Sequence, residues 1–106
     1  VLQEVARRMQ AAVRPDDTVS RQGGDEFVVI LARLRDPRDA ARVAEKMLDA
    51  MDAPIEVEGH RLHVSLSIGI ALFPQDASDM RSLMRQADAA LYHAKQAGRG
   101  RYSYFT

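Results

Sequence analysis

The residues best suited to chemistry form one short stretch, Gly23-Gly24-Asp25-Glu26, which lies between two β-branched and apolar segments. Thr18–Gln22 precedes this stretch and Phe27–Leu31 follows it. Two consecutive glycines permit positive φ angles or the close approach of another group, so the pattern predicts a β-hairpin with the four residues at its tip. Two adjacent carboxylates repel each other unless open solvent or a cation surrounds them. A hard divalent ion such as Mg²⁺ suits them, because it takes carboxylate oxygens and usually arrives with substrate phosphates.

A simpler interpretation of the same tip is a polar turn with solvated acids, because turns favour Gly and Asp for local reasons alone. Under the functional interpretation, the bare backbone of Gly23 and Gly24 would let a nucleotide lie beside the carboxylates without a clash. Both interpretations require the hairpin, and they differ in what the tip binds.

The remaining pattern predicts helices and hairpins in alternation, which fits an α+β fold with a mainly antiparallel sheet and helices packed against one side. An amphipathic helix is expected from Leu2 to Val13, ending before Pro15. The other expected elements are a helix that begins at Asp36-Pro37 and ends at Pro54, a hairpin of Ile55–Val57 with Arg61–Phe73, a helix capped by Ser78 or Asp79 that stops at Gly98, and a strand at Arg101–Phe105.

The long run from Arg61 to Phe73 alternates strictly between two faces. One face is predicted to be core and carries Leu62, Val64, Leu66, Ile68, Ile70 and Leu72. The other face has small residues at Ser67, Gly69 and Ala71. These small residues allow either close packing of a helix or room for a ligand.

Two further charged pairs are candidates for binding a phosphate or a purine. Lys95 and Arg99 are four apart, which predicts one helix face, although cations are favoured at helix C-termini in any case. Arg14 and Asp17 form an Arg-x-x-Asp motif; arginine can pair with a phosphate or a purine acceptor edge, and a carboxylate can accept guanine donors. Most such motifs are surface charge. The histidines at 60, 63 and 93 do not make a metal site.

A length of 106 residues limits the chain to one domain with a modest core. Lys plus Arg and Asp plus Glu number 15 each, so no electrostatic footprint for nucleic acid or an anionic membrane is present. There is no cysteine and no run long enough to cross a bilayer, which fits a cytoplasmic location, with anchoring of the parent protein left open. Because Val1 opens inside an amphipathic pattern, we expect a fragment of a longer protein.

The run Arg21-Gln22-Gly23-Gly24-Asp25-Glu26-Phe27, followed by Val-Val-Ile-Leu, resembles the signature of the GGDEF family of diguanylate cyclases. Ser67–Ile70 resembles the second core strand of the family, and Ala87–Lys95 with Gly98-Arg99 resembles its last helix. The resemblance extends from about residue 2 to residue 105. It implies the ferredoxin-like palm of nucleotide cyclases, truncated at its N-terminus, so that residues 1–106 are one partial GGDEF domain whose first strand and helix precede Val1.

The resemblance implies a diguanylate cyclase that condenses two GTP into cyclic di-GMP and releases pyrophosphate, as a homodimer, with Mg²⁺ or Mn²⁺. It assigns metal binding and deprotonation of the 3′-hydroxyl to Asp25, and support of the metal to Glu26. By the same resemblance Gly23 and Gly24 lie against the nucleotide, and Lys95 and Arg99 hold the triphosphate.

The spacing of Arg14 and Asp17 to the glycines equals that of the inhibitory product-binding site of the family, with Lys46 as a helper. The family's first-strand aspartate and its guanine-reading asparagine and aspartate belong to the part before Val1, so we expect the fragment alone to be inactive. The alternative is a non-catalytic module that binds GTP or cyclic di-GMP in a GGDEF-EAL phosphodiesterase, with a C-terminal EAL domain and an N-terminal sensory domain in the parent. A structural domain without a ligand is a third interpretation.

Overall fold

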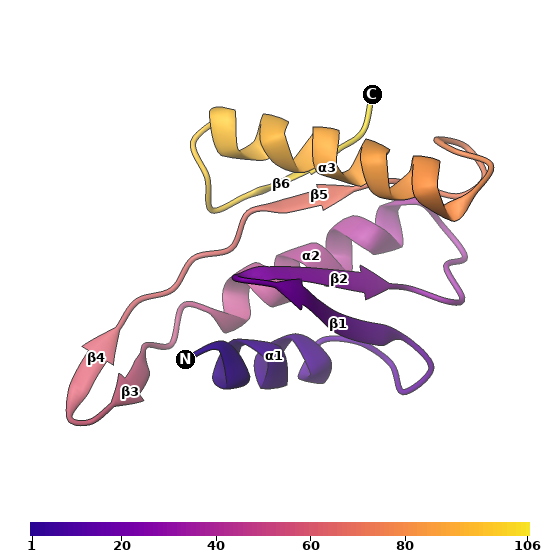
Figure 1. Cartoon of the computed structure of the whole chain (residues 1–106). Helices are drawn as coiled ribbons and strands as arrows, with labels where there is room; N and C mark the ends of the chain where they lie inside the picture. Colours follow the sequence, from indigo (N-terminus) through magenta and orange to yellow (C-terminus); the bar gives the residue numbers. More distant parts are fainter. The chain divides into compact units, whose positions relative to one another are not determined.

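A computed structural model describes all 106 residues, which divide into two compact units, Val1–Val64 and Ser65–Thr106. The first unit holds two helices and four strands, in the order helix, hairpin, helix, hairpin, and the other unit holds the last helix between two strands (Figure 1). The elements are α1 (Leu2–Ala11), β1 (Thr18–Gly23), β2 (Glu26–Ile30), α2 (Arg38–Ala50), β3 (Ile55–Val57), β4 (His60–Leu62), β5 (Ile68–Ile70), α3 (Met80–Gln96) and β6 (Tyr102–Tyr104).

Helix α1 forms where the amphipathic pattern predicts it and buries Val5 and Met9. The regular helix ends at Ala11, two residues earlier than expected, because the last turn tightens. The amides of Ala12 and Val13 donate to the carbonyls of residues 9 and 10, three residues back, at 3.1 and 3.3 Å. Helix α1 contacts both β1 and α2, so its apolar side joins the hairpin to the second helix.

The predicted start of the second helix is confirmed. Asp36 Oδ1 accepts the backbone N–H of Arg38 at 2.8 Å, and Pro37 already has helical angles, with φ −52° and ψ −30°. This is the geometry of an N-cap followed by proline in the first turn. The apolar stripe of α2 is buried at Ala40, Ala44 and Met47, and the C-cap residue Met51 is buried as well.

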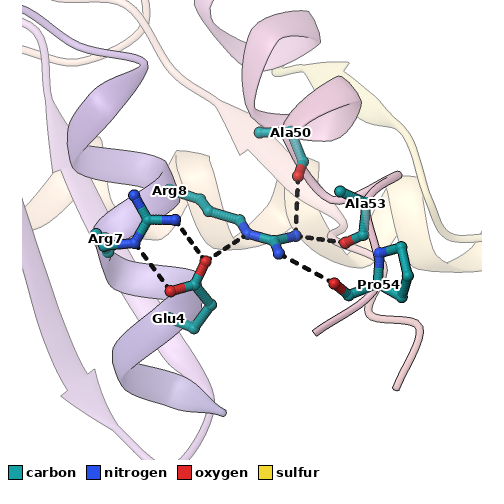
Figure 2. A network of polar contacts seen from close by, with 6 residues as sticks. All are labelled: Glu4, Arg7, Arg8, Ala50, Ala53 and Pro54. Atoms are coloured by element: carbon teal, nitrogen blue, oxygen red, sulfur yellow. Dashed lines mark hydrogen bonds and ion pairs between the residues drawn. The ribbon is translucent and has the colours of Figure 1, made fainter. Parts of the chain in front are cut away.

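One arginine fastens α1 to the C-terminal end of α2 (Figure 2). Arg8 Nη1 donates to the carbonyls of Ala50 and Ala53 at 3.0 and 2.6 Å, and Arg8 Nη2 donates to that of Pro54 at 3.3 Å. Arg8 Nε donates to Glu4 Oε2 at 2.8 Å. Ala50 is the last residue of α2, and Ala53 and Pro54 follow the helix, so this guanidinium satisfies one helix-end carbonyl and two loop carbonyls that would otherwise depend on water.

Both predicted hairpins are present. Strands β1 and β2 pair antiparallel, with Val19 opposite Val29 and Arg21 opposite Phe27. Strands β3 and β4 also pair antiparallel, with Ile55 opposite Leu62. Ile55 is buried, which brings the second hairpin into the core of the first unit at its base.

The prediction of one continuous strand from Arg61 to Phe73 is wrong. Strand β4 ends at Leu62 and pairs with β3, whereas β5 covers only Ile68–Ile70 and pairs with β6. Residues 63–67 belong to no ladder, so the run is divided between two sheets. Leu62 is therefore 40% exposed rather than core, and of the predicted core face only Ile70 is buried.

The second unit consists of α3 and a parallel pair of strands beside it (Figure 1). Gly69 lies at the contact: a Cβ there would be 2.2 Å from the carbonyl oxygen of Ala87 and 2.3 Å from the amide nitrogen of Leu91. Of the two interpretations of the small-residue face, close packing of a helix therefore holds at Gly69. Asp79 caps α3, accepting the N–H of Ser82 at 2.8 Å.

The strands form three two-stranded sheets instead of one mainly antiparallel sheet. Two pairs are antiparallel, as predicted, and the β5–β6 pair is parallel, with Ile68 opposite Tyr102 and Ile70 opposite Tyr104. The helix between β5 and β6 makes the parallel pairing possible, because parallel strands need a long crossover. None of the three helices combines the length and the apolar character of a membrane span.

Candidate functional site

The glycine-rich stretch lies at the tip of the β1–β2 hairpin, as the sequence predicts. Gly23 pairs with Glu26, and the register shifts between Arg21 and Gly23, which leaves Gln22 as an extra residue in β1. Gly24 has φ +54°, a left-handed conformation that glycine adopts at little cost. The bulge and the turn together bend the backbone so that Asp25 stands at the end of the hairpin.

The two carboxylates of the tip are exposed and free. The side chains of Asp25 and Glu26 take part in no ion pair or hydrogen bond. A Cβ built on Gly23 or Gly24 would meet nothing within 4 Å, so the backbone beside the carboxylates is open to an approaching group. This geometry leaves the acids available to a ligand, and it equally fits a solvated turn.

Arg21 has a role at this tip that sequence reasoning missed. Its Nε donates to the carbonyl of Gly24 at 2.8 Å, so the side chain reaches forward over the bulge and holds the turn. The signal that could have indicated it is the position of an arginine two residues before the glycine pair, at the end of a strand. Arg21 therefore fixes the backbone next to Asp25 without contacting either carboxylate.

The carboxylate oxygens of Asp25 and Glu26 are suitable ligands for a hard divalent cation, but two carboxylates do not complete its coordination. Two carboxylates supply oxygen ligands, and Mg²⁺ usually keeps several waters and binds substrate phosphates as well. No group of three or more histidine, aspartate, glutamate or cysteine side chains is close enough to hold a metal ion. Asp25 and Glu26 would thus serve as a partial site that a phosphate ligand completes.

The Arg-x-x-Asp motif occupies the turn between α1 and β1, and its carboxylate organises that turn. Asp17 Oδ2 accepts the N–H of Arg14 at 2.9 Å, and Asp17 Oδ1 accepts the N–H of Ala32, also at 2.9 Å. The neighbouring Asp16 pairs with Arg33 at 3.0 Å. The side chains of Arg14 and Lys46 are exposed and have no partner. Any ligand of this motif would meet a free guanidinium and a carboxylate already engaged with backbone.

The expectation that Lys95 and Arg99 share one helix face is wrong. Lys95 lies in the last turn of α3, but the helix ends at Gln96, with Ala97 as its C-cap. The amide of Gly98 donates to the carbonyl of Lys95 at 3.3 Å, and the amide of Arg99 donates to the carbonyl of Ala94 at 3.2 Å. These two hydrogen bonds are those of a Schellman motif, which ends a helix. Arg99 therefore lies in the loop after the helix, with φ +59°.

The candidate residues divide between the two units. Asp25, Glu26 and the Arg14–Asp17 turn belong to Val1–Val64, and Lys95 and Arg99 belong to Ser65–Thr106. Within the second unit, the side chains of Lys95 and Arg99 are both exposed and unpaired. Each unit thus carries part of the predicted set, and of the charged side chains in that set only Asp17 is already engaged.

Comparison with known proteins shows the family. Residues 1–101 match the family model described as diguanylate cyclase, GGDEF domain. The chain is 48% identical over 105 residues to the bifunctional diguanylate cyclase/cyclic di-GMP phosphodiesterase MucR of Pseudomonas aeruginosa, an alignment that covers 99% of this chain and 15% of MucR.

Two solved structures extend the comparison. A form of Pseudomonas aeruginosa TpbB comprising only the GGDEF domain matches with a TM-score of 0.97 and 40% identity, over 99% of this chain and 62% of the TpbB chain. The GGDEF domain of DgcB from Caulobacter crescentus, solved in complex with c-di-GMP, matches with a TM-score of 0.74 and 27% identity, over 95% of this chain and 63% of that one. The chain therefore spans less than two thirds of each of these relatives. On the family match over residues 1–101, the chain belongs to the diguanylate cyclase GGDEF domain family.

Proposed function

We propose that the protein carrying this chain is a diguanylate cyclase, which condenses two GTP into cyclic di-GMP and releases pyrophosphate. The observation that carries the proposal is the tip of the β1–β2 hairpin, where an unbroken Gly23-Gly24-Asp25-Glu26 stretch leaves two exposed, unpaired carboxylates beside open glycine backbone. For the in-line attack of a ribose 3′-hydroxyl on an α-phosphate, the protein mainly has to position the two reacting groups and neutralise the phosphate charge.

The residues of the chain have distinct roles in this proposal. The carboxylates of Asp25 and Glu26 hold Mg²⁺ or Mn²⁺, and Asp25 also accepts the proton of the 3′-hydroxyl. The bound metal would neutralise phosphate charge and orient the phosphate oxygens. Gly23 and Gly24 allow the nucleotide to lie against the backbone.

Lys95 and Arg99 bind the triphosphate in the same proposal. A lysine supplies a compact charge, and an arginine can donate two parallel hydrogen bonds to phosphate oxygens. Both side chains are exposed and unpaired, so no existing interaction has to break before a phosphate binds. Catalysis in this proposal uses a homodimer, with one GTP on each subunit.

We also propose that cyclic di-GMP inhibits the enzyme by binding at Arg14 and Asp17, with Lys46 assisting. Support comes from the free guanidinium of Arg14 on a turn that Asp17 holds in place. Each oxygen of the Asp17 carboxylate accepts one backbone N–H, and a carboxylate has about four acceptor sites, so capacity remains for a guanine donor.

The 106 residues by themselves are proposed to be inactive and to bind GTP weakly. The tip provides carboxylates from one element only, and no third ligand for a metal lies close to them. Two-metal catalysis of phosphoryl chemistry needs ligands from separate elements. Formation of cyclic di-GMP by residues 1–106 alone would contradict this proposal.

A second candidate function is a non-catalytic module that binds GTP or cyclic di-GMP and regulates an attached phosphodiesterase domain of the EAL type. The similarity to MucR, whose name records both activities, supports the attached phosphodiesterase domain and does not favour loss of the cyclase activity. An N-terminal sensory domain is compatible with either function.

The experiment incubates the full-length protein with GTP and Mg²⁺ and measures cyclic di-GMP and pyrophosphate. We expect both products, and a rate at least about 100-fold lower in Asp25→Asn, since removing a positioned charged group has effects of this size. The control Asp49→Asn, on the exposed side of α2, should match wild type. Binding of GTP or cyclic di-GMP without product formation would favour the regulatory module instead.

A further inference from the structure

The loop after α3 holds three consecutive residues at positive φ: Gly98 at +128°, Arg99 at +59° and Gly100 at +60°. Glycine tolerates such angles, but a residue with a side chain does not adopt the left-handed region without cost. Arg99 is therefore a strained residue between two permissive ones. Strain of this kind persists only where surrounding contacts fix the backbone.

The backbone of Arg99 is held on both sides. Its amide donates to the carbonyl of Ala94 at 3.2 Å, which closes the end of α3. Its own carbonyl accepts a hydrogen bond from Arg101 Nε at 3.4 Å. The second contact is long, but it comes from a charged donor, which strengthens it relative to a neutral one.

The guanidinium of Arg101 also covers Gly98. A Cβ at Gly98 would lie 2.9 Å from Arg101 Nη2 and 3.5 Å from Arg101 Cζ, so the charged group lies directly over the glycine. Gly98 is favoured at this position by its φ angle, and the absence of a side chain leaves the space that Arg101 takes. The side chain of Arg101 spans the whole turn from residue 98 to residue 99.

The main chain of Arg101 is itself anchored. Its carbonyl accepts the N–H of Ile68 at 2.9 Å, immediately before the parallel pairing of β5 with β6. This bond connects the main chain of Arg101 to the start of β5, and the side chain of Arg101 contacts the carbonyl of Arg99. The guanidinium of Arg99 meanwhile has no partner of its own.

We propose that Arg101 is a positioning residue that holds Arg99 in its left-handed conformation, so that the free guanidinium of Arg99 is presented to the polyphosphate of the nucleotide. The proposal rests on the proposed function of Arg99 as a triphosphate-binding residue. Arg101 acts through the backbone carbonyl of Arg99 and does not contact the phosphates.

The experiment measures GTP turnover by the full-length protein and its affinity for GMP, which lacks the two outer phosphates. We expect Arg101→Ala to raise the KM for GTP roughly three- to tenfold, the scale of losing one hydrogen bond, with kcat within about twofold. Affinity for GMP should not change. Arg101→Lys should restore part of the loss, because an ammonium group can still donate to the Arg99 carbonyl.

A double-mutant cycle separates positioning from direct contact. Arg99→Ala should raise the KM for GTP at least as much as Arg101→Ala, and the double variant should be no worse than Arg99→Ala. The control Arg81→Ala removes another exposed arginine of the same unit and should behave as wild type. A double variant clearly worse than Arg99→Ala would overturn the proposal, because Arg101 would then bind phosphate itself.

Two other outcomes distinguish failure of the positioning role of Arg101 from failure of the proposed function. If Arg101→Ala leaves the KM for GTP unchanged while Arg99→Ala raises it, the positioning role of Arg101 is overturned and the proposed function stands. If the wild-type protein binds GTP but forms no cyclic di-GMP, the proposed function fails, and the same variants then test Arg101 through the affinity for GTP.

Discussion

The carboxylate of Asp17 accepts the backbone N–H of Ala32 at 2.9 Å, and this bond ties the turn before β1 to the chain just after β2. The open end of the β1–β2 hairpin, opposite its tip, is thus held by a side-chain hydrogen bond as well as by the backbone pairing of the two strands. Asp17 also holds its own turn through the N–H of Arg14. A residue that resembles a ligand-binding aspartate is therefore a structural part of the hairpin that carries the tip.

We predict that Asp17→Ala lowers the free energy of unfolding by about 1–3 kcal/mol, because two backbone donors lose their acceptor. Asp17→Asn should cost less, since its amide oxygen can still accept one of the two bonds. Urea denaturation measures both variants. Asp49→Ala, which removes an exposed carboxylate without a partner, is the control, and a loss of similar size there would contradict the assignment.

We predict that Arg14→Ala in the full-length protein abolishes inhibition by cyclic di-GMP and leaves stability unchanged. The guanidinium has no partner within the chain, so its removal breaks no existing contact. Initial rates of product formation at increasing cyclic di-GMP measure the effect, with Arg35→Ala as an exposed arginine control. Unchanged inhibition in Arg14→Ala would remove the support for a product site at this turn.

We predict that Gly69→Ala destabilises the second unit by about 3 kcal/mol or more, because overpacking against backbone cannot be relieved by rotating a side chain. The added methyl group would lie within 2.3 Å of backbone atoms of α3 at Ala87 and Leu91. Thermal denaturation measures the change. Ala89→Ser, which adds one atom on the exposed side of α3, should change stability little, and equal losses in the two variants would contradict close packing at Gly69.

Local pattern was sufficient to predict the hairpin tip and the three helices. Gly23 and Gly24 between two β-branched runs specify a turn wherever the chain goes next, and Asp36-Pro37 carries its own capping geometry. The alternation from Arg61 to Phe73 was not sufficient to predict the sheet. It indicates which side chains share a face of a strand, but it does not indicate which other strand pairs with it.

The candidate site was predicted as a set of residues and not as a geometry. The position of Arg99 depends on hydrogen bonds that end α3 one turn before it, and spacing alone placed it on the helix. The contacts of Arg8 join residues 42 to 46 positions apart, and those of Arg21 and Arg101 depend on the paths of a bulge and a loop. No periodic signal in the sequence encodes such contacts.

We predict that Arg8→Ala lowers the free energy of unfolding by about 2–4 kcal/mol, because the last carbonyl of α2 and two carbonyls in the segment after it lose a charged donor. The side chain of Arg8 is only 13% exposed. Arg7, which pairs with the same Glu4 but is 68% exposed, is the matched control, and Arg7→Ala should change stability much less. Urea denaturation of the two variants compares them directly; similar losses would contradict the role of Arg8 in joining α1 to α2.

The carboxylate of Glu4 should make the stability of the protein depend on pH in the acid range. Hydrogen bonds from Arg7 and then Arg8 lower the pKa of Glu4 from its ordinary value of 4.5 to about 2. Because the folded state favours the charged carboxylate, the stabilisation is complete above pH 4.5 and is lost as the pH falls from 4.5 towards 2. Glu4→Gln should therefore flatten the dependence of stability on pH over this interval, as measured by urea midpoints.

Asp36 provides the comparison for Glu4, because a hydrogen bond from the Arg38 side chain lowers the pKa of Asp36 from 3.8 to about 2. Its contribution should begin to disappear only below pH 3.8, so Asp36→Asn should flatten a narrower interval than Glu4→Gln. Raised salt should weaken both effects, since the pairs are partly exposed to solvent. A Glu4→Gln curve parallel to wild type between pH 4.5 and 2 would show that the carboxylate does not depend on its two arginines in the folded state.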